Sequence, residues 1–241
     1  MKTLAAGTFF LILSLSTTVF GETALRKAPD VQDDMAALRN GAALFIDYCL
    51  SCHSLSFVRY NRLAALGFSD RQIREMMTTA DSPGEPMRIA ARMADQKRWF
   101  GAAPPDLSLV ARSRASDKGS GADWLYAYMR SFHRDENRPT GWNNTVLANV
   151  AMPHVLWNVQ DAQTTGNGQG TDIRKIPSSK DYDERIAELA GFLVWAGEPE
   201  AAFRKRTGMG VMAFLFVFLA LAYALKKDYW REIENEKIEK N

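Results

Sequence analysis

Residues 49–53 of this 241-residue chain read CLSCH and contain its only two cysteines. On a helix, Cys49 and Cys52 lie about one turn apart, so both sulfur atoms can reach the two vinyl groups on one edge of a porphyrin. The adjacent His53 can then turn its imidazole toward the iron. The C-x-x-C-H spacing therefore predicts covalent attachment of one c-type haem, with His53 as an axial ligand.

Other uses of these three side chains fit less well. A disulfide between Cys49 and Cys52 would close a small strained ring, which is typical of redox-active dithiols rather than of structural crosslinks. The strand–helix–strand context of a thioredoxin-like site is missing from the sequence around it. A structural zinc site needs four ligands, whereas CLSCH offers at most three, two of them adjacent. Of these interpretations, only covalent haem attachment uses Cys49, Cys52 and His53 together.

Both ends of the chain are apolar. Residues 1–21 carry one early lysine, an apolar run and small residues before Glu22, which is the pattern of a cleaved secretory signal peptide. A retained membrane anchor is the alternative. Residues 207–225 contain no charged side chain and would extend about 30 Å as a helix, enough to cross a bilayer core. Four segments are thus expected: signal peptide 1–21, exported haem domain 22–203, transmembrane helix 207–225 and cytoplasmic tail 226–241.

Charge supports this division. Basic residues flank both sides of the apolar segment 207–225, so the export signal rather than the flanks predicts the orientation. We expect one span of the inner membrane, with the haem domain on the periplasmic side. Residues 22–203 contain 21 Lys and Arg against 23 Asp and Glu, so the basic excess of the chain comes from the membrane flanks. A nucleic-acid-binding surface is therefore not expected.

The region between the apolar ends has helical periodicity in four places, at residues 31–49, 69–80, 121–133 and 182–197. Long loops rich in glycine and proline separate them, and no run alternates well enough to predict a strand. The expected fold is mostly α, a cytochrome c-like haem domain with long loops and one C-terminal transmembrane helix. A domain with so much irregular chain needs something other than a sheet at its centre, and a haem can fill that place.

Haem iron in an electron carrier usually has a second axial ligand, a histidine or a methionine. His133 and His154 are the remaining histidines, and ten methionines compete with them. Met152 is distinctive because Pro153 holds it extended in a loop, far enough along the chain to reach the opposite face of the ring. The residues favour Met152 and leave His154 as the alternative.

The loop at residues 101–114, GAAPPDLSLVARSR, supplies other candidate pocket residues. Pro104 and Pro105 would make a stiff apolar wall. Arg112 or Arg114 could meet a haem propionate, because guanidinium matches carboxylate in a bidentate geometry. On the residues alone, an ordinary solvated arginine pair is the favoured interpretation.

Six segments occur in order along the chain: CLSCHSL, APPDLSLVARSR, DWLYAYMRSF, RPTGWNN, MPHVLW and LKKDYW. Together, over about residues 30–231, they resemble cytochrome c1, the haem subunit of the proteobacterial quinol–cytochrome c reductase. The resemblance implies that His53 and Met152 are the axial ligands. It also implies that Pro105 lines the haem pocket and that Arg114 holds a propionate.

These observations predict an electron carrier, not a catalyst on its own, because a six-coordinate iron has no open position for oxygen or peroxide. The resemblance implies transfer from a Rieske iron–sulfur subunit to a cytochrome c, next to cytochrome b in the lipid bilayer, in a dimeric complex. The alternatives are the haem subunit of a terminal oxidase, a haem peroxidase or gas sensor, and a thiol oxidoreductase without haem. The loop 164–172 receives no role, because such proteins differ there in length.

Overall fold

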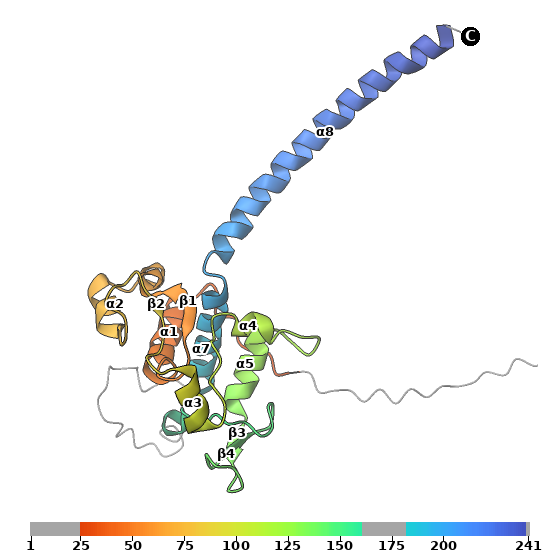
Figure 1. The fold of residues 1–241 in the computed structure, drawn as a ribbon. Helices are drawn as coiled ribbons and strands as arrows, with labels where there is room; N and C mark the ends of the chain where they lie inside the picture. The colour runs from red at the N-terminus through yellow and green to blue at the C-terminus, as the bar shows by residue number, and fades with distance from the viewer. Residues whose placement is uncertain (1–24, 161–181, 240–241) are drawn as a thin grey trace, which may run out of the picture.

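Two helices that cross at the centre of the domain position the cysteine motif (Figure 1). Helix α1 (Met35–Tyr48) is capped by Asp34, the residue before it, whose carboxylate accepts hydrogen bonds from two N–H groups of the first turn. Helix α7 (Tyr182–Gly197) is the main packing partner of α1. The crossing requires Gly41, since a β-carbon at that position would lie 2.0 Å from the carbonyl oxygen of Glu188. The motif CLSCH follows directly at the end of α1.

The computed structural model describes residues 25–160 and 182–239. The predicted signal peptide 1–21 and the loop 164–172 lie outside these residues. Within the described part the chain is mostly helical, as the sequence predicts.

Two further helices complete the wall around α7. Helix α5 (Gly121–Arg130) has a capping box at Ser120 and Asp123, in which each side chain accepts from the backbone N–H of the other. The short helix α4 (Val110–Ser113) precedes it, and both pack against α7. A β-carbon at Gly121 would lie 1.6 Å from the carbonyl oxygen of Ala111, so glycine permits this contact as well.

Shorter elements fill the stretch from the cysteine motif to α4 and the stretch after α5. They are β1 (Leu55–Arg59), η1 (Tyr60–Leu66), α2 (Asp70–Met76), β2 (Pro86–Met87), α3 (Met93–Phe100), β3 (Phe132–Arg134) and β4 (Trp142–Asn144). β1 pairs with β2 and β3 with β4, both antiparallel. The strands were not expected from the sequence, because two to five residues are too few to produce a readable alternation.

The predicted helices all exist, but α1 begins later than the expected residue 31, and α2 and α5 end earlier than expected. α2 stops at Met76 because Met77 adopts an extended conformation. α5 ends at Arg130, and the chain continues into β3, which includes Phe132 and His133. The core between α1 and α7 contains Phe45 and Phe192, whose ring centroids are 5.7 Å apart and whose side chains are fully buried.

Helix α8 (Ala201–Glu239) projects away from the domain as one long, gently curved rod (Figure 1). Within its segment Phe203–Arg231, an 18-residue window has a mean hydropathy of 2.3 and is not buried against the rest of the protein. It is long and apolar enough to cross a membrane, in agreement with the expected span at 207–225. At its foot, Glu198 forms ion pairs with Arg112 and Arg204.

Candidate haem site

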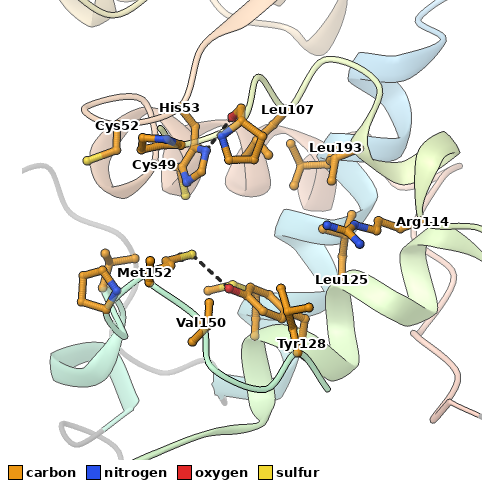
Figure 2. A pocket seen from close by; sticks show the side chains of 18 of the residues that line it. Cys49, Cys52, His53, Leu107, Arg114, Leu125, Tyr128, Val150, Met152 and Leu193 are labelled. Atoms are coloured by element: carbon orange, nitrogen blue, oxygen red, sulfur yellow. Dashed lines mark hydrogen bonds between the residues drawn. The ribbon is translucent and has the colours of Figure 1, made fainter. Parts of the chain in front are cut away.

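A cavity of about 490 Å³ opens between α1, α5, α7 and two loops, within the size range of small-molecule and cofactor sites (Figure 2). Its walls are largely apolar, and α7 contributes Ile186, Leu189, Ala190 and Leu193. The six residues that the sequence identifies as site candidates all line this one cavity: Cys49, Cys52, His53, Pro105, Arg114 and Met152. The fold thus brings together side chains as far apart in the sequence as Cys49 and Met152.

The cysteine motif makes the upper wall in Figure 2. Beyond α1 the chain turns tightly, with the N–H groups of Cys52 and His53 both donating to the carbonyl oxygen of Cys49. Burial raises the pKa of the Cys49 thiol to about 12. A reactive cysteine nucleophile needs a depressed pKa instead, so this environment does not fit a thiol oxidoreductase.

His53 is oriented by the opposite loop. Its Nδ1 lies 2.7 Å from the carbonyl oxygen of Pro105. Because a carbonyl only accepts, Nδ1 carries the proton and Nε2 keeps its lone pair free. Burial also lowers the pKa of His53 below its ordinary value, which keeps the imidazole neutral. Pro105 therefore does more than line the pocket, since its carbonyl sets the tautomer that a metal ligand requires.

Met152 lies across the cavity from His53, on the lower wall in Figure 2. Its sulfur accepts a hydrogen bond from the hydroxyl of Tyr128 at 3.4 Å. Burial raises the pKa of Tyr128 to about 12, so the hydroxyl keeps its proton and remains a donor at neutral pH. A thioether and a neutral imidazole thus stand on opposite sides of one apolar cavity.

The loop that carries Met152 is held by residues of the RPTGWNN segment. Arg138 donates to the carbonyl oxygen of Asn149 at 2.8 Å, and the side-chain oxygen of Asn143 accepts from the N–H of Asn149 at 2.9 Å. Asn149 has φ of 61°, the single positive φ outside glycine among the described residues. The side-chain oxygen of Asn144 accepts from two further N–H groups of the loop. This segment therefore fixes the loop conformation just ahead of Met152.

The structure separates the two arginines of the ARSR segment. Arg112 pairs with Glu198 at 3.1 Å, at the foot of α8. Arg114 lines the cavity, and its guanidinium lies 4.4 Å from the ring centroid of Trp124. Figure 2 shows its side chain directed toward the cavity from the end of α4. Of the pair, Arg114 is the one placed to meet an anionic group of a bound cofactor.

The histidine alternatives lie elsewhere. His154 is fully buried, stacked on Phe132 with ring centroids 4.9 Å apart, and its Nε2 lies 2.7 Å from the side-chain oxygen of Gln160. It is not among the described residues that line the cavity. His133 is exposed on β3. Neither histidine side chain lines the cavity opposite His53, as Met152 does.

The site therefore has the donor set that haem c requires. Two thiols for covalent bonds lie at one end of an apolar cavity, a neutral imidazole and a thioether face each other across it, and a guanidinium stands at its edge. This composition fits a haem with its apolar ring inside and its propionates near the arginine.

Comparison with known proteins agrees with this composition. The model of the Cytochrome C1 family matches residues 27–233. The chain belongs to the cytochrome c1 family. It is 35% identical to cytochrome c1 of Allochromatium vinosum, an alignment that covers 97% of this chain and 100% of the relative. Membership confirms haem c as the cofactor and places the chain among the haem subunits that carry electrons in the bc1 complex of respiratory chains.

Two relatives carry other names. A protein named ammonia monooxygenase gamma subunit, from Nitrosomonas europaea, is 40% identical over 93% of this chain and 97% of its own length. A protein named cytochrome b/c1, from Bradyrhizobium diazoefficiens, is 29% identical over 83% of this chain and 34% of its own length. Relatives of this chain thus carry the names of different assemblies.

Sequence reasoning missed several residues that shape this cytochrome c1 site. Tyr128 and Trp124 stack one helical turn apart on α5, with ring centroids at 4.8 Å, and both line the cavity. Gln96 on α3 is buried and donates to the carbonyl oxygen of Cys52 at 3.1 Å, which ties α3 to the cysteine motif. The spacing of Trp124 and Tyr128 was visible in DWLYAYMRSF, but the partner of the tyrosine hydroxyl was not.

Proposed function

We propose that this cytochrome c1 is the membrane-anchored monohaem subunit that passes electrons from a Rieske iron–sulfur protein to a cytochrome c within quinol–cytochrome c reductase. The observation that carries the proposal is the placement of His53 and Met152 on opposite walls of one apolar cavity. When bound, haem c supplies a one-electron couple. The residues around it decide how that couple is held and tuned.

Each site residue has a defined part in the proposal. Cys49 and Cys52 would hold the haem covalently, and His53 and Met152 would ligate its iron from opposite sides. That leaves no open coordination position, which favours electron transfer over a peroxidase or a gas sensor. Arg114 would hold a propionate, and Pro105 would orient His53 through its carbonyl. The thioether is a soft ligand that favours the reduced iron and raises the reduction potential.

Substitution of Met152 by leucine tests the ligand set. The variant is expected to retain covalent haem, to lose the weak far-red absorption band of methionine–iron ligation, and to show a potential lower by on the order of hundreds of millivolts. Its reduced form should bind carbon monoxide, whereas the unaltered protein should not. Redox titration and difference spectra of the detergent-purified protein measure these effects.

Met129→Leu is the matched control, because Met129 is a buried methionine that also lines the cavity but belongs to helix α5. It should keep the far-red band. If Met129→Leu loses the band while Met152→Leu keeps it, the axial ligand is Met129 and the assignment of Met152 is wrong.

The proposed membrane arrangement extends the same function. Residues 1–21 would be removed as a signal peptide, the haem domain 22–203 would lie in the periplasm, segment 207–225 would span the inner membrane, and 226–241 would be a cytoplasmic tail. The long apolar helix α8 supports the span. N-terminal sequencing of the purified protein should begin at Glu22. Protease added to spheroplasts should degrade the haem domain, and a band starting at Met1 or a protected domain would contradict the arrangement.

The partners are tested by purifying the intact protein in detergent and identifying the proteins that accompany it. Cytochrome b and a Rieske protein, in a dimeric complex, are the expected companions. The relative named cytochrome b/c1 supports the first of these. Subunits of a terminal oxidase, or of an ammonia monooxygenase as the name of the Nitrosomonas europaea relative raises, would instead assign the chain to that assembly.

A further inference from the structure

The sulfur of Met152 accepts a hydrogen bond from a side chain that is not one of the proposed iron ligands. The hydroxyl of Tyr128, on helix α5, donates to its sulfur at 3.4 Å, as the dashed line in Figure 2 marks. Tyr128 is buried and lines the same cavity. A thioether sulfur has two lone pairs, so one can accept this hydrogen bond while the other faces the cavity.

The tyrosine ring is fixed on two sides. Trp124, one turn earlier on α5, stacks on it with an interplanar angle of 10°. Phe132 meets it edge-on, with ring centroids 5.2 Å apart. Arg114 in turn packs on Trp124. Because the ring cannot rotate freely between these neighbours, the direction of its hydroxyl is set by packing and not by the ligand.

The backbone of Tyr128 is tied to the same loop. The side-chain amide of Asn144 donates to the carbonyl oxygen of Tyr128 at 2.7 Å, while its oxygen accepts from the N–H groups of Val146 and Leu147. Hydrogen bonds therefore join helix α5 to the loop of Met152 both at the Tyr128 carbonyl group, through Asn144, and at the Tyr128 side chain. A shift of one would carry the other with it.

We propose that Tyr128 is a positioning residue for Met152, whose hydroxyl aims the thioether across the cavity toward His53 and draws electron density from its sulfur. The inference rests on the proposed ligation by Met152. A sulfur that accepts a hydrogen bond on one lone pair is a weaker electron-pair donor to iron through the other, and this weaker donation disfavours oxidised iron more than reduced iron. Tyr128 thus raises the reduction potential beyond what the thioether alone would give.

Tyr128→Phe removes only the hydroxyl, and full-length holoprotein in detergent is the material for the test. The variant should retain covalent haem and the far-red methionine band. Its reduction equilibrium should shift roughly tenfold toward the oxidised form, about 59 mV for a one-electron couple. Tyr182→Phe is the matched control, because Tyr182 is also buried and its hydroxyl donates to the carbonyl oxygen of Met129 at 2.9 Å instead. Its potential should change less than roughly twofold in equilibrium constant by the same conversion.

A double-mutant cycle separates this inference from the ligand assignment. In a Met152→Leu background, Tyr128→Phe should have no further effect on the potential, since the sulfur through which it acts is gone. If the effect persists there, or if Tyr128→Phe alone matches the Tyr182→Phe control, the inference is wrong although Met152 remains the ligand. If Met152→Leu itself leaves band and potential unchanged, both the ligand assignment and the inference fail.

Discussion

A methyl group added at Gly41 tests whether the crossing of α1 and α7 holds the haem cavity together. The new β-carbon would lie 2.0 Å from the carbonyl oxygen of Glu188 and 2.9 Å from the β-carbon of Phe192, whereas ordinary contacts begin near 3.4 Å. The first obstacle is helix main chain, which cannot rotate away. The helices must therefore separate at the middle of α1, about two turns before the cysteine motif.

The size of the effect follows from two opposing contributions. Overpacking of a core costs about 1–3 kcal/mol or more, while alanine gains about 1 kcal/mol over glycine in a helix interior. Backbone contact at 2.0 Å places Gly41→Ala at the upper end of the cost. We expect a net loss of about 2 kcal/mol or more in the free energy of unfolding.

Gly191→Ala is a graded comparison on the facing helix. There the nearest atom is a side-chain methyl of Val31 at 2.3 Å, which can turn away at lower cost. Denaturant unfolding of the detergent-solubilised holoprotein, followed by haem absorbance and tryptophan fluorescence, gives both midpoints. A Gly41→Ala midpoint equal to that of the unaltered protein, or higher than that of Gly191→Ala, would refute the claim that this crossing is tightly fixed.

Two further variants address the loop of Met152 and the start of α5. Arg138→Gln removes a charge-assisted hydrogen bond to the carbonyl of Asn149; it should cost about 1.5–3 kcal/mol and allow the reduced protein to bind carbon monoxide, measured by difference spectra. For Asp123, partial burial acts to raise the pKa, but hydrogen bonds from the N–H groups of Ala28 and Ser120 outweigh it and leave the pKa below its ordinary value. The ionised carboxylate therefore stabilises the fold above about pH 4, and the stabilisation is lost as pH falls through the folded pKa. Asp123→Asn should cost about 1 kcal/mol at pH 7, and its denaturation curve should converge with that of the unaltered protein as the pH falls through the folded pKa; an equal deficit at pH 7 and in acid would contradict this role.

Local signals in the sequence were enough to predict the helices and the cofactor. Helices α1, α2, α5 and α7 were expected because apolar periodicity and capping residues act within a few positions. The CLSCH motif is equally local, since its three side chains are neighbours. Met152 was predicted as the second axial ligand from its position in a loop and then from the family resemblance. Its role as a ligand remains a prediction.

Other parts of the site depend on contacts that no local pattern encodes. Tyr128 and Met152 are 24 residues apart, and their hydrogen bond exists only once α5 and the loop are packed. Arg138 is an ordinary charged residue in the sequence, and the two carbonyl groups it holds follow eleven and twelve residues later. The structure also divides Arg112 from Arg114, a pair that the residues alone left open and in which only the family resemblance favoured Arg114.

The junction between α7 and α8 limits how far the haem domain can travel. Only Glu198, Pro199 and Glu200 separate the two helices, and three extended residues reach about 10 Å at most. Glu198 is in addition paired with arginines on both sides of the junction. If α8 is held in a bilayer as proposed, the cavity stays at nearly constant height and tilt above the membrane surface. This protein would then act as a stationary relay, and the search between donor and acceptor would be carried out by its partners.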